Sequence, residues 1–226
     1  MSDLAALMQK LGVDIDAELL SLALTHRSYA YENGGIPHNE RLEFLGDSVL
    51  GQATTVLLYT RNPTLDEGEL AKRRASVVST VALAESARRI GLGEFIKLGR
   101  GEENTGGRDK DSILADTTEA IIGATYLSRG QDVATTLVHS IVEPLLADPE
   151  RYGAAMDPKT SLQEIAAALG EPAPSYEITA SGPDHDRRFT ATVTVGHVTT
   201  TGEGTSKKTS EMAAALAAWR VLSKRD

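Results

Sequence analysis

The sequence contains no cysteine. Disulfide bonds, zinc sites with thiolate ligands and cysteine nucleophiles are therefore excluded. No apolar run approaches the roughly 18 residues that a membrane-spanning helix needs, and residues 1–12 lack the apolar segment of a signal peptide. We therefore expect a soluble, cytoplasmic protein without a membrane partner.

Basic residues are scarce for a protein that would bind nucleic acid. The 226 residues include 23 Lys and Arg against 32 Asp and Glu, a net charge of −9, whereas nucleic-acid binders usually carry a basic footprint. Residues 157–226 are nearly balanced, with 8 basic and 9 acidic residues. Any nucleic-acid site must therefore depend on local features.

Hydropathy divides the chain into two parts of different class. Residues 1–148 show helical periodicity and no strand alternation. The predicted helical stretches are 18–31, 39–60, 69–92 and 111–147, and residues 99–107 are expected to form a flexible loop. A linker is expected at 149–156.

Residues 157–226 combine helical and strand patterns. Phe189, Ala191, Val193 and Val195 alternate with threonines, as in a half-buried strand. The predicted order is α-β-β-β-α, with a helix at 161–169, strands at 176–180, 189–195 and 198–201, and a helix at 208–224.

An acidic helix face is the most specific feature of the first part. At about 100° per residue, Glu40, Glu43 and Asp47 share one face, and leucines and Val49 occupy the other. The alternative is a solvated acidic stripe. Phe44 lies beside the acids, where a solvated face should not expose it, so we expect something to cover it.

A second acidic pair, Asp116 and Glu119, opens the most apolar helical segment, Ala120–Leu127. One interpretation is an N-terminal cap at Asp116. The other is that the carboxylates cluster around a cation, because close carboxylates repel unless a cation joins them. With no thiolates and few histidines, Mg²⁺ is the best candidate, and such a site suits phosphodiester hydrolysis.

Three segments resemble those of the ribonuclease III family: Asn39–Leu50, Ser112–Ala120 and Leu24–Tyr29. The resemblance implies an all-α endonuclease domain over residues 1–148 that uses Mg²⁺, for which Mn²⁺ can substitute. The implied catalytic residues and metal ligands are Glu43, Asp47, Asp116 and Glu119.

The same resemblance assigns three further residues. Glu40 and Glu67 match accessory acidic positions, although Glu67 could equally be an exposed loop acid. Phe44 matches the residue that packs into a partner subunit, which implies a homodimer.

Other polar groups of this part give weaker signals. His26 is expected to be a hydrogen-bonded structural residue rather than a metal ligand. Arg100, Arg108 and Lys110 are expected to be solvated loop charges. Because no P-loop or GxGxxG motif is present, we expect no nucleotide or organic cofactor.

The last helix begins with a basic pair, Lys207 and Lys208, which opposes the helix dipole unless an anion docks there. A solvated basic turn is the alternative. In its α+β context, residues 157–226 resemble the double-stranded-RNA-binding domain, which reads A-form shape. The implied RNA-binding residues are Thr160, Gln163, Glu164, His185, Ser206, Lys207 and Lys208. Trp219 is expected to pack in the core or at its rim.

The sequence therefore predicts an endoribonuclease that cleaves double-stranded RNA and leaves 5′-phosphate and 3′-hydroxyl ends with two-nucleotide 3′ overhangs. The resemblance implies ribosomal and messenger RNA precursors as substrates. One alternative is a double-stranded-RNA-binding regulator that does not cut. A metal phosphohydrolase acting on small nucleotides is another.

Overall fold

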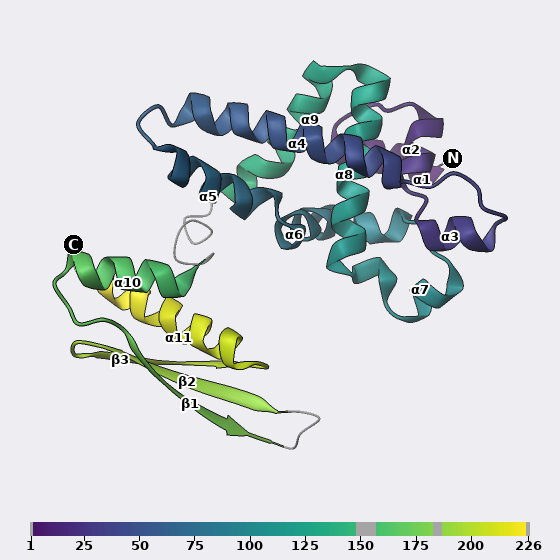
Figure 1. The fold of residues 1–226 in the computed structure, drawn as a ribbon. Helices are drawn as coiled ribbons and strands as arrows, with labels where there is room; N and C mark the ends of the chain where they lie inside the picture. Colours follow the sequence, from purple (N-terminus) through teal and green to yellow (C-terminus); the bar gives the residue numbers. More distant parts are fainter. Residues whose placement is uncertain (1, 148–156, 183–186, 225–226) are drawn as a thin grey trace. The chain divides into compact units, whose positions relative to one another are not determined.

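The computed structural model describes residues 2–147, 157–182 and 187–224 (Figure 1). The chain divides into two units, Met1–Ala147 and Asp148–Asp226, and each is described by itself. The predicted linker 149–156 lies outside the described residues.

The first unit is helical, as the periodicity predicts. Its elements are α1 (Ser2–Leu11), α2 (Ala17–Ala23), α3 (Arg27–Glu32), α4 (Glu40–Arg61), α5 (Glu67–Val78), α6 (Thr80–Ile90), η1 (Leu92–Phe95), α7 (Arg100–Asn104), η2 (Gly107–Asp109), α8 (Asp111–Arg129) and α9 (Gln131–Leu146). Across the described ranges, none of the helices is long and apolar enough to cross a membrane.

Two predicted helices are each broken by a capping residue. Ser79 is extended (ψ 152°) and ends α5, and its hydroxyl accepts a hydrogen bond from the N–H of Ala82 in α6. His26 is also extended and N-caps α3, next to a bridge between Thr25 and Lys97. Side-chain acceptors at these positions compete with the helical hydrogen-bond pattern, which periodicity alone does not reveal.

The predicted loop at 99–107 is wrong, because this segment contains α7 and leads into η2. The Arg108 guanidinium donates to the carbonyl oxygens of Gly93 (2.9 Å) and Ile96 (3.0 Å) and pairs with Glu103. Lys110 pairs with Glu102. Arg108 and Lys110 are therefore tied into the fold rather than left as free loop charges.

Helix α8 is the central element of the first unit. It packs against α2, α4, α6 and α9, and in Figure 1 it crosses α4. Its buried residues point in every direction around the helix, as an apolar segment such as Ala120–Leu127 requires. The crossing of α4 and α8 brings the two acidic segments of the sequence together.

The second unit is a three-stranded antiparallel sheet with two helices. Its elements are α10 (Pro158–Ala168), β1 (Ser175–Ser181), β2 (Arg188–Val195), β3 (Val198–Gly204) and α11 (Lys207–Leu222), with strand order β1-β2-β3. Ala191, Val193 and Val195 are fully buried, and Trp219 packs against this core. The predicted α-β-β-β-α order and the packing of Trp219 are confirmed.

Candidate metal centre

Three carboxylates from two helices converge at the α4–α8 crossing. Glu43 from α4 and Asp116 and Glu119 from α8 each offer an oxygen atom, and these atoms lie within 4.8 Å of one another. All three side chains are half-buried. The cap interpretation of Asp116 does not hold, because α8 begins at Asp111 with Lys110 as its N-cap residue.

Two glycines allow the helices to approach this closely. A Cβ atom on Gly46 would lie 1.8 Å from the carbonyl oxygen of Glu119, and one on Gly123 would lie 2.2 Å from the carbonyl oxygen of Leu42. Neither position has room for any side chain. The separation of Glu43 from Glu119 thus depends on backbone-to-backbone contact between α4 and α8.

The cluster carries charge that the fold alone does not balance. Burial, reinforced by the charges of Asp47, Asp116 and Glu43, raises the pKa of Glu119 to about 7. Burial also raises the pKa of Glu43 and that of Asp116. A set of oxygen ligands whose charges oppose one another in this way fits a hard divalent cation, which would relieve the repulsion.

The remaining predicted acids lie around this cluster rather than in it. Asp47 is exposed on α4, and its charge is the largest electrostatic contribution to the raised pKa of Glu119. Glu40, the first residue of α4, is exposed and pairs with Arg27 at 3.6 Å. Glu67 is exposed at the start of α5 and is not one of the three clustered acids.

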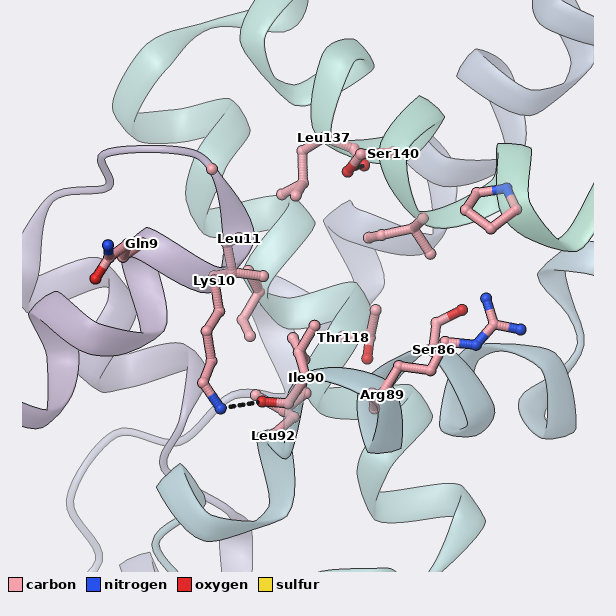
Figure 2. A pocket seen from close by; sticks show the side chains of 15 residues that line it. Gln9, Lys10, Leu11, Ser86, Arg89, Ile90, Leu92, Thr118, Leu137 and Ser140 are labelled. Carbon is pink, nitrogen blue, oxygen red and sulfur yellow. Dashed lines mark hydrogen bonds between the residues drawn. The ribbon is translucent and has the colours of Figure 1, made fainter.

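A polar cavity of about 560 Å³ adjoins the carboxylates. Glu43, Asp116 and Glu40 line it, together with residues from the start of α3 and from the segment before α8. A second cavity, of about 280 Å³, lies between α1, α6, α8 and α9 (Figure 2). Its lining is largely apolar and includes no acidic residue, so the polar cavity is the one that suits a cation and a phosphate ester.

Sequence reasoning missed two residues of the polar cavity. Arg27 lines it with an exposed side chain, and Asn39 lines it from the N-cap position of α4. Asn39 is almost fully buried, yet its side chain makes no capping hydrogen bond. Only the tertiary fold brings these positions beside Asp116.

His26 is buried and hydrogen-bonded, as predicted, and it also lines the polar cavity. It is 9% exposed, and its Nδ1 atom accepts a hydrogen bond from the N–H of Ser28 (3.2 Å). Burial lowers its pKa, which keeps the ring neutral and able to accept.

Three large apolar side chains on α4 are exposed in the described part of the chain. The side chain of Phe44 is 79% exposed, and Val56 and Tyr59 are exposed farther along the same helix. The expectation that another group covers Phe44 is therefore not met by the described part of this chain.

The predicted RNA-binding residues occupy the helix starts of the second unit. Thr160, Gln163 and Glu164 are exposed on α10, and Lys207 and Lys208 are the first residues of α11, after the N-cap Ser206. His185 lies outside the described residues. A 2.7 Å ion pair between Lys159 and Glu211 joins the two helices, which pack against each other.

Comparisons with known proteins agree with the division of the chain into two units. Residues 16–145 match the family described as Ribonuclease-III-like, and residues 158–222 match the double-stranded RNA binding motif. Ribonuclease 3 of Leifsonia xyli subsp. xyli is 69% identical over 222 residues, covering 98% of this chain and 94% of that protein. Ribonuclease 3 of Mycobacterium tuberculosis is 57% identical over 220 residues, covering 96% and 92%.

Two solved structures resemble the first unit. The nuclease domain of ribonuclease III from Campylobacter jejuni superposes with a TM-score of 0.61 at 39% identity, covering 66% of this chain and 99% of that one. A second structure of that domain, described for flexibility in a region involved in dimer formation, has a TM-score of 0.59 at 39% identity and covers 63% and 98%.

Proposed function

Because this chain belongs to the ribonuclease III family, we propose that it is a Mg²⁺-dependent endoribonuclease that hydrolyses phosphodiester bonds in double-stranded RNA. The observation that carries the proposal is the convergence of Glu43, Asp116 and Glu119 within 4.8 Å beside an open polar cavity. A regulator that only binds RNA would have no need of three half-buried carboxylates whose repulsion destabilises the fold.

The carboxylates have distinct tasks in this proposal. Glu43, Asp116 and Glu119 hold the ion, and Asp47 adds its charge at the exposed edge. When bound, Mg²⁺ supplies Lewis-acid activation of water and stabilisation of the leaving oxygen. In the metal-free protein a pKa of about 7 leaves the carboxyl of Glu119 about half protonated near neutral pH, so a bound cation would compete with a proton at this oxygen. Glu40 and Glu67 assist from the periphery.

We propose the products and cellular substrates that the resemblance to ribonuclease III implies. Hydrolysis leaves 5′-phosphate and 3′-hydroxyl ends, and paired cuts leave two-nucleotide 3′ overhangs. The substrates are precursors of ribosomal and messenger RNA. The second unit holds the duplex through Thr160, Gln163, Glu164, His185, Ser206, Lys207 and Lys208.

We infer that the enzyme acts as a homodimer. Phe44 is 79% exposed on the helix that carries Glu43, and burying such a side chain is favourable by about 1.5–3 kcal/mol. A dimer would cover it with a second copy of the chain, and it would present two carboxylate clusters to one duplex. The Campylobacter jejuni nuclease domain, whose dimer-forming region has been described, supports this inference.

The proposal is tested by incubating the protein with a long RNA duplex, with Mg²⁺ and then with EDTA, followed by sequencing of the product ends. We expect short duplexes with the stated ends in Mg²⁺ and intact RNA in EDTA. A single strand of the same sequence is the control. Equal cutting of the single strand, or cutting in EDTA, would contradict the proposal.

A further inference from the structure

Arg27 is an exposed cation beside the carboxylate cluster. It begins α3, its side chain is 73% exposed, and it lines the polar cavity that contains Glu43 and Asp116. It also lines a neighbouring cavity of about 590 Å³ that includes the exposed Tyr31. A group that runs along both cavities would therefore pass the guanidinium.

The backbone of Arg27 is fixed although its side chain is not. The N–H of His26 donates to the carbonyl oxygen of Lys97 (3.2 Å). The hydroxyl of Ser28 accepts a hydrogen bond from the N–H of Gly99 (2.9 Å). Both neighbours of Arg27 are thus tied to the segment before α7, which sets where the guanidinium can reach.

Arg27 is also the cation of this cavity that its neighbours hold least tightly. Lys110, which lines the same cavity, donates to Glu102 and to the hydroxyl of Thr105 (3.0 Å). The contact between Arg27 and Glu40 is 3.6 Å long, beyond ordinary hydrogen-bond distance. Both partners are largely exposed, and such pairs contribute little stability, so the guanidinium can leave Glu40 for a stronger ligand.

A cation in the polar cavity would favour the approach of an RNA phosphate to the carboxylates. An RNA strand brings phosphates toward a surface rich in carboxylates, and an arginine fork binds phosphate through two parallel charge-assisted hydrogen bonds. The charge of Arg27 already reaches the cluster, since it opposes the rise in pKa of both Glu43 and Asp116.

We propose that Arg27 binds a phosphate of the RNA strand lying in the cleavage site and exchanges its weak contact with Glu40 for that phosphate. The inference rests on the proposed function and adds a substrate contact to it.

The test compares Arg27→Gln and Arg27→Lys with Arg41→Ala. Arg41 is a matched control, because it is exposed next to Glu40 but lines neither cavity. Arg27→Gln should lower kcat/KM by about 10- to 100-fold, as expected for a charged hydrogen bond. Arg27→Lys should retain only part of the wild-type kcat/KM, because an ammonium group lacks the planar fork of the guanidinium. Arg41→Ala should stay within about twofold of wild type.

Salt dependence separates a phosphate contact from a structural role. In a Glu119→Gln background, which should bind RNA without cutting it, Arg27→Gln should reduce the slope of log K against log salt by about 0.9, and Arg41→Ala should leave it unchanged. A structural role would instead lower the melting temperature and leave the slope intact.

Equal slopes and equal kcat/KM for Arg27→Gln and Arg41→Ala would overturn the inference. If wild-type protein cuts no duplex RNA, the proposed function fails, and the salt slope of RNA binding then decides the Arg27 contact by itself.

Discussion

Replacing Glu119 with glutamine should stabilise the metal-free protein while abolishing its activity. Glu119 has a folded-state pKa of about 7 against an ordinary value of 4.5. Below pH 4.5 both states are protonated, and the carboxyl has no effect. As the pH rises through the interval up to about 7, the unfolded state releases its proton first, so wild-type stability falls. Glutamine cannot titrate and avoids this loss.

The size of the effect follows from the pKa difference. A difference of about 2.5 corresponds to about 3.4 kcal/mol, and because the carboxyl is partly exposed we expect about 1–2 kcal/mol. The assay is urea unfolding in EDTA at about pH 5 and about pH 8, followed by circular dichroism, with exposed Glu94→Gln as the control. The stability gained by Glu119→Gln should appear at about pH 8 and shrink at about pH 5. A gain in stability of equal size at the two pH values, or no gain at about pH 8, would refute the electrostatic argument.

Substitutions at Gly46, at Phe44 and at the Lys207–Lys208 pair test three other features of the structure. Gly46→Ala should lower the free energy of unfolding by about 1–3 kcal/mol, because its Cβ would meet the Glu119 carbonyl oxygen. The same substitution should abolish the rise in melting temperature caused by Mg²⁺. Gly51→Ala is the control: its Cβ meets nothing within 4 Å, and the variant should unfold at a slightly higher temperature. Phe44→Ala should shift sedimentation toward monomer, and an unaltered dimer would contradict its interface role. Replacing Lys207 and Lys208 together with alanine should weaken duplex binding and lower its salt slope by about 1.8, and an unchanged slope would show that neither lysine contacts phosphate.

Local spacing predicted the fold class and the two acidic helix faces, whereas the resemblance to ribonuclease III assigned the carboxylates of both faces to one site. The one-turn separation of Asp116 and Glu119 places them on one face of any helix, and alternation around Val193 predicts a strand wherever its apolar face is buried. The structure confirms the helical first unit, the α-β-β-β-α second unit and the hydrogen-bonded state of His26.

The features that the sequence did not reveal depend on tertiary contacts. The break at Ser79 comes from a side chain that caps the next helix. The order in the segment after Gly99 comes from Arg108, which donates to the carbonyl oxygens of Gly93 and Ile96, and from Lys110, which pairs with Glu102 inside the segment. Arg27 joins the site because α3 packs against α7 and its first residues are hydrogen-bonded to the segment before α7. The catalytic, metal-binding, accessory, RNA-binding and dimer-interface assignments all stay predictions.

The carboxylate cluster at the α4–α8 crossing is proposed to be the site that cleaves double-stranded RNA. The most direct measurement follows one labelled duplex with wild-type protein and with Glu119→Gln, in Mg²⁺, recording binding and cleavage on the same samples. We expect equal binding by both proteins and cleavage by the wild type alone. Cleavage by Glu119→Gln at the wild-type rate would place the chemistry elsewhere, and binding without cleavage by the wild type would identify a regulator rather than a nuclease.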